Sequence, residues 1–306
     1  MKIVFNAHDV GLGNNGGSRT IIRSAETLRD LGHEVLISGT ANRASWFKTD
    51  IPFVRKIPEC DALIATGYHS VKTTKKFRGA RTKLWYVRGH EVWQAKDHVL
   101  WDTYASINVV TNSSWIHEEL KRRGTDSKVI YQGIDFDQWY RSRPADLVVG
   151  GISHPKQSKR SKDCLDIAKR AGYSSRMLNR DIRSGKVDEL RDFYSSCAVW
   201  VSASENEGLQ NVPIEATLCG AALVLTDHPQ SGNADYGIND ETCMVYRARA
   251  IKQGASDVKR LMEDEALRNR LQSNAEKTIK EKIGDRPTNM RKLTAHIEHL
   301  ISEGKR

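Results

Sequence analysis

Short apolar runs alternate with longer amphipathic stretches along almost the whole chain. The runs are rich in Val, Ile and Leu and have the length of buried strands, whereas the stretches between them carry apolar residues at helical spacing. Strands that alternate with helices in this way predict parallel, doubly wound α/β sheets. Two series of strands are predicted, the first at residues 2–7, 34–38, 62–66, 83–87, 107–111 and 128–131, and the second at residues 147–152, 175–178, 198–202, 222–226 and 243–246.

The two series predict two domains and a terminal helix. The seam between the series holds several charged residues together with Trp139 and Pro144, so we place the linker there. Near the end of the chain, Met290, Leu293 and Ile297 fall on one helical stripe, and Gly284 and Pro287 break the chain before it. The predicted segments are an N-terminal domain at residues 1–143, a second domain at residues 144–284 and a helix within residues 285–306.

Composition is consistent with this organisation. A chain of 306 residues with 39% hydrophobic content can bury two α/β cores. No apolar run approaches the length of about 18 residues that a membrane-spanning helix needs, and the chain begins directly with a strand, so we expect no transmembrane segment and a cytoplasmic location. The five cysteines are scattered without a C-x-x-C spacing, which predicts buried free thiols.

The segment from Ser204 to Ala216 sets two carboxylates, Glu207 and Glu215, eight positions apart across a glycine-containing turn. An apolar strand precedes the turn and a helix follows it, so Glu207 is predicted at the carboxyl end of a strand, where open α/β sheets bind ligands. Backbone N–H groups at the start of the helix can meet a diphosphate, and Glu215 can accept hydroxyl groups of a ribose. The predicted donor-binding residues of this turn are Gly208, Leu209, Asn211, Val212 and Glu215.

This segment, E-G-x-x-N-V-x-x-E-A followed by C-G-A-A-L-V-L-T-D, resembles the E-x7-E signature of retaining GT-B glycosyltransferases of the GT4 type. Gly16-Gly17, followed by a helix and L-G-H-E-V, is similar to the N-terminal segment of that family. The resemblance implies two Rossmann-like domains that face a cleft, with a terminal helix that crosses back to the N-terminal domain. It also implies transfer of a sugar from a nucleotide-diphosphate sugar to a hydroxyl group with retention of configuration.

The resemblance assigns roles to further residues. Glu207 would hold the donor sugar, although sequence leaves open whether it acts as a nucleophile or as an electrostatic stabiliser. His90 resembles the histidine that reaches the donor sugar, and Lys159 resembles the lysine that faces the diphosphate. The family usually has an arginine where this chain has Ile152 or Ser153, so Lys156 and Arg160 are predicted as substitutes. Gly16 and Gly17 are predicted to let the backbone approach the donor and acceptor at a helix start.

Two other motifs indicate different chemistry. Residues 11–16 have the form G-x-G-x-x-G, but the loop is long for a dinucleotide-binding turn and no acidic residue ends the second strand. Asp135 and Asp137 form a D-x-D, but they lie in the predicted linker, where a structural turn fits better. We therefore predict neither a cofactor nor a metal ion.

The charge distribution bears on the acceptor. Residues 1–143 contain 22 Lys and Arg against 15 Asp and Glu, and six cations fall within residues 72–83. A basic surface with tryptophans nearby suits an anionic acceptor, although a solubilising helix face explains the charges equally well. The predicted acceptor- or anion-binding residues are Lys72, Lys75, Lys76, Arg78, Arg81 and Trp93.

The sequence thus predicts a metal-independent retaining glycosyltransferase whose partners are a nucleotide sugar and a glycan or lipid-linked glycan. The alternative acceptor is DNA with a hydroxymethylated pyrimidine, which a basic N-terminal domain would favour. A noncatalytic DNA- or glycan-binding module would leave the paired Glu motif without a purpose, and a phosphorylase of this architecture would need a pyridoxal lysine motif that the sequence lacks. The base and sugar of the donor and the oligomeric state carry no signal in the sequence.

Overall fold

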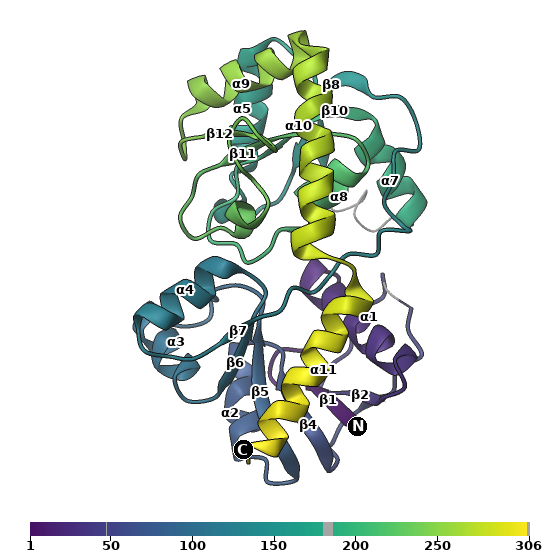
Figure 1. Ribbon diagram of the computed structural model, residues 1–306, viewed down its shortest axis with the longest axis vertical. Helices are drawn as coiled ribbons and strands as arrows, with labels where there is room; N and C mark the ends of the chain where they lie inside the picture. The colour runs from purple at the N-terminus through teal and green to yellow at the C-terminus, as the bar shows by residue number, and fades with distance from the viewer. Residues whose placement is uncertain (47, 180–185, 305–306) are drawn as a thin grey trace. The chain divides into compact units, whose positions relative to one another are not determined.

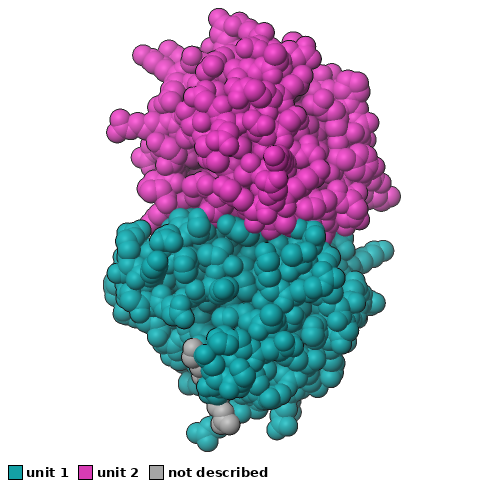
Figure 2. All heavy atoms as spheres, viewed as in Figure 1, with its two compact units in different colours: residues 1–133, 285–306 teal, residues 134–284 magenta. Residues whose placement is uncertain are grey.

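The computed structural model describes residues 1–46, 48–179 and 186–304. The chain divides into two compact units, coloured separately in Figure 2. Unit 1 comprises residues 1–133 and 285–306, and unit 2 comprises residues 134–284. Each unit has one parallel sheet with helices on both faces, as the alternation of strands and helices predicted.

The described sheet of unit 1 has seven strands in the order β3-β2-β1-β4-β5-β6-β7. Neighbouring strands pair in parallel, with Val4 of β1 opposite Leu36 of β2 and Leu63 of β4. The predicted strands are present, and β3, a two-residue edge strand, was not predicted because it is too short to form an apolar run. The strands are β1 (Lys2–Asn6), β2 (Glu34–Ser38), β3 (Phe53–Val54), β4 (Cys60–Ala65), β5 (Ala80–Val87), β6 (Asn108–Thr111) and β7 (Lys128–Val129).

Helices cover both faces of this sheet. On one face, α1 (Gly16–Asp30) and α11 (Arg286–Ser302) lie side by side, and Met290, Leu293 and Ile297 of α11 enter the same buried cluster as Ile3 and Phe5 (Figure 1). The other face, where Trp85 of β5 is buried, carries α2 (Tyr68–Lys76), α3 (Asp97–Tyr104) and α4 (Ser114–Arg122).

Unit 2 has a described sheet of five parallel strands in the order β12-β11-β10-β8-β9. Successive side chains of a strand point to opposite faces, so Val199 and Val201 of β10 enter one core while Trp200 between them contacts Tyr194 on the other face. The strands are β8 (Asp146–Ile152), β9 (Ser175–Leu178), β10 (Cys197–Ser202), β11 (Ala222–Thr226) and β12 (Met244–Tyr246). The helices are α5 (Ser161–Ala171), α7 (Val187–Ser195), α8 (Asn211–Leu218), α9 (Ile251–Glu263) and α10 (Glu265–Thr278), with shorter turns η1 (Gln157–Lys159), η2 (Gly232–Asp235) and η3 (Ile279–Ile283).

The boundary between the units differs from the predicted one, which lay after residue 143. Residues 134–143 belong to unit 2 because their side chains are anchored there. Trp139 is buried edge-on against Tyr194, with 5.7 Å between the ring centroids, and Arg141 Nη2 donates to the carbonyl oxygen of Gly220 over 2.6 Å. The chain returns to unit 1 at Asp285, next to Gly133. A Cβ atom on Gly133 would lie 2.3 Å from Arg286 Cα, so this contact within unit 1 requires glycine.

The five cysteines are buried and free, as predicted. None of the described helices is long and apolar enough to cross a bilayer.

Candidate functional site

The segment with the two glutamates forms the loop between β10 and α8, at the centre of the unit 2 sheet. The backbone of this loop is held by the segment that follows β11: Glu207 N donates to the Gln230 carbonyl oxygen over 2.9 Å, and Gly232 N donates to that of Gly208 over 3.0 Å. A Cβ atom on Gly232 would lie 2.5 Å from the Gly208 oxygen, so only glycine allows this approach. Glu207 is therefore held at the carboxyl end of the sheet, where ligands of α/β proteins bind.

Glu207 and Lys159 are brought together, although 48 positions separate them in the sequence. Lys159 lies in η1, after β8, and its Nζ donates to Glu207 Oε1. The side chains are 23% exposed for Lys159 and 19% exposed for Glu207, so the pair is reachable from solvent yet partly shielded from it. The backbone adds a second link, because Glu205 N donates to the Ser158 carbonyl oxygen over 2.7 Å. The structure thus joins the predicted sugar-binding carboxylate to the predicted phosphate-binding lysine.

The other predicted phosphate-binding residues lie on the same turn. Arg160 has a left-handed backbone with φ of +48° and its guanidinium binds both carboxylate oxygens of Asp163, at 2.9 and 3.0 Å. Lys156 begins the turn, and its backbone N–H donates to His154 Nδ1 over 3.0 Å. Arg160 would therefore have to exchange Asp163 for a phosphate, whereas Lys159 already points at the loop of Glu207.

Sequence reasoning missed Glu205 and Arg249. Arg249 Nε and Nη2 donate to the two carboxylate oxygens of Glu205 at 3.0 and 3.3 Å, and Arg160 Nε lies 4.0 Å from Glu205 Oε1. The hydrogen bond from Arg249 lowers the pKa of Glu205 below its ordinary value, so this carboxylate is ionised at neutral pH. Glu205 therefore organises two guanidinium groups beside the loop of Glu207.

Glu215 lies in the second turn of α8 and is only 6% exposed. Its Oε2 accepts a hydrogen bond from the phenolic hydroxyl of Tyr194 in α7 over 3.0 Å, which was not predicted. A buried carboxylate needs such partners, and its remaining lone pairs can accept others. Gly208 and Leu209 are buried in the turn, while Asn211 and Val212 open α8 and are half-buried. The first N–H groups of a helix have no partner within it, so this end of α8 can bind an anion.

His90 is placed in the aromatic core of unit 1 and is 1% exposed. Its Nε2 lies 2.7 Å from Asp97 Oδ1 and its Nδ1 lies 3.2 Å from the Tyr104 hydroxyl, while its ring stacks on Trp101 with 4.4 Å between centroids. Burial lowers the pKa of His90, and the hydrogen bond to Asp97 opposes this only in part. Both ring nitrogens have protein partners. The contact of His90 with a donor sugar stays a prediction, and it requires that Asp97 or Tyr104 give up its hydrogen bond to the ring.

Gly16 and Gly17 form the first turn of α1, at a helix start, as the sequence predicted. The helix begins here because Asn15 caps it, with Asn15 Oδ1 accepting a 2.9 Å hydrogen bond from Ser18 N. Arg88, at the end of β5, donates to the carbonyl oxygens of Gly17 and Thr66. This arginine was not singled out in the sequence, although a charged residue directly after a buried strand was a signal. The turn is thus fastened to the carboxyl end of the unit 1 sheet.

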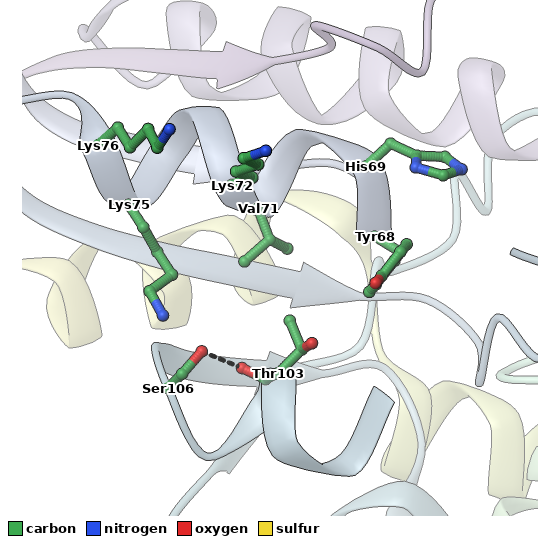
Figure 3. A pocket seen from close by; sticks show the side chains of 8 residues that line it. All are labelled: Tyr68, His69, Val71, Lys72, Lys75, Lys76, Thr103 and Ser106. Atoms are coloured by element: carbon green, nitrogen blue, oxygen red, sulfur yellow. Dashed lines mark hydrogen bonds between the residues drawn. The ribbon is translucent and has the colours of Figure 1, made fainter. Parts of the chain in front are cut away.

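The predicted anion-binding residues separate into two groups. Lys72, Lys75 and Lys76 of α2 line a cavity of about 430 Å³ against α3 (Figure 3). Arg81 instead forms an ion pair of 3.1 Å with Asp61, and the Trp93 side chain, 51% exposed, lies outside the residues that line the cavity, as does Arg78. The charge run in the sequence therefore resolves into one local cluster of three lysines.

Within the described residues, no group of three or more His, Cys, Asp or Glu side chains is arranged to hold a metal ion. The site in unit 2 brings together a cationic turn, a helix N-terminus and the Glu207 carboxylate.

Comparisons with known proteins bear on the fold and on the reaction class. Residues 174–278 match the family model described as glycosyl transferases group 1. A search of curated proteins found no significant match. Among solved structures, Anabaena HepE in complex with UDP-glucose matches with a TM-score of 0.78 and 16% identity, over 98% of this chain and all of that chain.

Two further structures have the same fold. Sucrose-phosphate synthase from Thermosynechococcus elongatus matches with a TM-score of 0.76 and 14% identity, over 99% of this chain and 100% of that chain. An α-glucosyltransferase in complex with UDP-glucose and DNA containing an abasic site matches with a TM-score of 0.66 and 13% identity, over 97% and 98%. The chain therefore has the two parallel α/β units of GT-B glycosyltransferase structures, and its match to glycosyl transferases group 1 spans the segment that carries Glu207 and Glu215.

Proposed function

We propose that this protein is a retaining glycosyltransferase of the GT4 type that transfers a sugar from a nucleotide-diphosphate sugar to a hydroxyl group. The observation that carries the proposal is the pairing of Glu207 with Lys159 beside the N-terminus of α8. A carboxylate for sugar hydroxyls and a cation for phosphate are thereby held at one place. The family match over residues 174–278 and the fold of the glycosyltransferase structures support the same reaction class.

The chemistry would be mainly electrostatic. When the bond between sugar and diphosphate breaks, negative charge gathers on the leaving diphosphate, and Lys159 with the first N–H groups of α8 would stabilise it. Lys156 and Arg160 are the further cations of the same turn. Glu207 would hold the donor sugar once Lys159 turns to the phosphate. The proposal includes no cofactor and no essential metal ion, because these residues and N–H groups supply the positive charge.

The proposed donor is a uridine nucleotide sugar. HepE and the DNA-bound α-glucosyltransferase were both solved with UDP-glucose, which supports this base. Glu215, at the second turn of α8, would accept hydrogen bonds from the ribose hydroxyls.

The proposed acceptor is a hydroxyl group of a glycan or a lipid-linked glycan. DNA with a hydroxymethylated pyrimidine is the second candidate. Two observations favour it: the cluster of Lys72, Lys75 and Lys76 in unit 1, and a solved relative in fold that holds DNA. A noncatalytic binding module is disfavoured, since it would give the pair of Glu207 and Lys159 no task.

Calorimetric titration with UDP-, GDP-, ADP- and TDP-sugars tests the donor site. We expect one of them to bind, and Lys159→Gln to weaken that binding about tenfold, because a hydrogen bond to a charged group contributes about 1.5–3 kcal/mol. Lys162→Gln is the matched control: Lys162 is 82% exposed and is paired with Asp166 on the outside of α5. Absence of binding to every nucleotide sugar, or equal losses in both variants, would remove the proposed site.

A further inference from the structure

A groove between α2 and α3 of unit 1 has a charge pattern that the donor site does not explain. The cavity has a volume of about 430 Å³ and is lined on one side by Lys72, Lys75 and Lys76, and on the other by Thr103 and Ser106 (Figure 3). We call these five residues the lysine groove. Its volume is within the range of sites for small ligands, about 300–1,000 Å³.

The three lysines have no acidic partner. Among the described residues, no carboxylate forms an ion pair with any of them, and none lines the cavity. Lys72 is three and four positions from Lys75 and Lys76, a spacing at which like charges on a helix repel. The last turn of α2 favours cations at Lys75 and Lys76 through the helix dipole, but Lys72 lies a turn earlier. An anion bound in the groove would relieve the repulsion among these ammonium groups.

The opposite wall of the groove is neutral and fixed. Ser106 Oγ donates to the Thr103 carbonyl oxygen over 2.6 Å, and Thr103 Oγ1 donates to that of Val99 over 2.7 Å. Their hydroxyl protons are thus engaged in the turn that ends α3. In Figure 3, Lys75 reaches from α2 toward this wall. A ligand in the groove would therefore be bound by the ammonium groups and shaped by the wall.

We propose that the lysine groove binds the phosphodiester backbone of a nucleic acid strand, which deepens the proposed function in the form that has DNA, its second candidate, as the acceptor. The role of the groove as an acceptor site rests on the proposed function. Binding of a nucleic acid strand to the groove does not, since it can be measured without a sugar donor. Lysine ammonium groups act as mobile point charges, which suits a row of phosphates of variable geometry.

The shape of the groove distinguishes a strand from a membrane surface. A lipid surface is broad and flat, whereas the exposed lysines Lys72, Lys75 and Lys76 line a concave space between α2 and α3, into which Lys75 reaches in Figure 3. From Tyr68 to Lys76 the groove follows α2 for about 12 Å, at 1.5 Å per residue. A flexible chain with a charge at each repeat fills such a space.

Fluorescence anisotropy with a labelled oligodeoxythymidylate of about 12 nucleotides tests the proposal. The variant is the triple substitution Lys72→Gln, Lys75→Gln and Lys76→Gln. The control replaces Lys56, Lys121 and Lys128 by Gln, which are exposed lysines of unit 1 outside the groove, so the net charge changes equally. If the triple variant does not fold, Lys72→Gln alone is used for the same measurement, and the expected change in the salt slope is then about a third as large.

The expected result is that the groove variant binds about tenfold or more weakly at 50 mM salt. Its slope of log affinity against log salt should fall by about 2, because single strands lose about 0.7 per neutralised phosphate. The control should keep the wild-type slope. Equal losses in both variants would overturn the site, as would absence of oligonucleotide binding at low salt. Stronger binding to phosphatidylglycerol vesicles than to the oligonucleotide would also overturn it, in favour of a membrane.

Titration of UDP into the same proteins separates this proposal from the proposed function. Oligonucleotide binding without binding of UDP, or of GDP, ADP or TDP titrated in the same way, would uphold the groove and refute the donor site. UDP binding that is unaffected by the groove variant, together with no oligonucleotide binding, would refute the groove and uphold the donor site.

Discussion

Glu207 and Glu215 belong to one sequence motif but stand in different surroundings. Glu207 is on a loop, partly exposed and paired with Lys159. Glu215 is inside α8 and accepts a hydrogen bond from the buried hydroxyl of Tyr194. A charge that must change partners during a reaction suits the first environment, and a charge that must hold one ligand in place suits the second. The two roles can therefore be separated by substitution.

The role of Glu215 can be tested with a matched pair of variants. Tyr194→Phe removes the hydrogen bond from the Tyr194 hydroxyl to the Glu215 carboxylate, whereas Glu215→Gln keeps the size of the side chain and removes its charge. We expect Glu215→Gln to weaken UDP binding about tenfold, since ribose hydroxyls lose a charged acceptor worth about 1.5–3 kcal/mol. Tyr194→Phe should retain most of the affinity. Calorimetry showing unchanged UDP affinity in a folded Glu215→Gln protein would exclude this residue from the donor site.

At this scale the sequence predicted residue types better than partners. The pairing of Glu207 with Lys159 was foreseen only as two roles in one donor site, and the structure adds the contact itself. The bond between Arg249 and Glu205 joins residues 44 positions apart, and no spacing in the sequence indicates it. His90 was assigned from its place after a strand, but Asp97 and Tyr104 occupy its nitrogens. Such partners depend on tertiary packing, which a local motif does not contain.

Among the elements, α11 shows how a simple pattern specifies a packing partner. Its apolar stripe was readable because Met290, Leu293 and Ile297 recur at helical spacing, and all three are fully buried in unit 1. Asp285 caps the helix by accepting a 2.6 Å hydrogen bond from Thr288 N, which explains the start just after Gly284. A terminal segment thus completes the core of a unit from whose first part, residues 1–133, it is separated by residues 134–284.

Leu293→Ala should destabilise unit 1 by about 2–5 kcal/mol, because it deletes buried methyl groups and leaves a cavity among α1, α11 and the sheet. The neighbouring Lys292→Ala is the control, since its side chain is exposed on the outer face of α11. Urea unfolding followed by circular dichroism measures both. A loss in Leu293→Ala no larger than that in Lys292→Ala would show that α11 does not contribute to the core as described.

Element boundaries were less predictable than elements. Apolar runs located the strands of both sheets, since buried parallel strands are apolar on both faces. The two-residue strand β3 was missed, because its ladder depends on β2 and not on its own sequence. The start of α1 was predicted only as lying at the glycine pair, and the cap supplied by Asn15 sets it at Gly16. A side-chain cap outweighs the low helix propensity of two glycines.

For the whole molecule, two α/β units were predictable because each has a complete alternation of strands and helices. The boundary between the units was predicted after residue 143 from the polar composition of residues 135–144. In the structure the side chains of Trp139 and Arg141 anchor this segment to unit 2. The cations of residues 72–83 were predicted to form one basic surface. In the structure three of them, Lys72, Lys75 and Lys76, line the lysine groove, whereas Arg81 is paired with Asp61. Composition reports how much charge a unit carries, and only the fold decides where the charges converge.

Proton NMR of the anomeric signal shows whether this protein transfers a sugar with retention of configuration at Glu207. The protein is mixed with the nucleotide sugar that binds best, and the first sugar product is observed before its anomers equilibrate. We expect release of the nucleoside diphosphate and a first product with the configuration of the donor. In Glu207→Gln we expect a rate about 10²-fold lower, with nucleotide affinity retained. Inverted configuration, an unchanged rate in Glu207→Gln, or no release from any nucleotide sugar would contradict retention at Glu207.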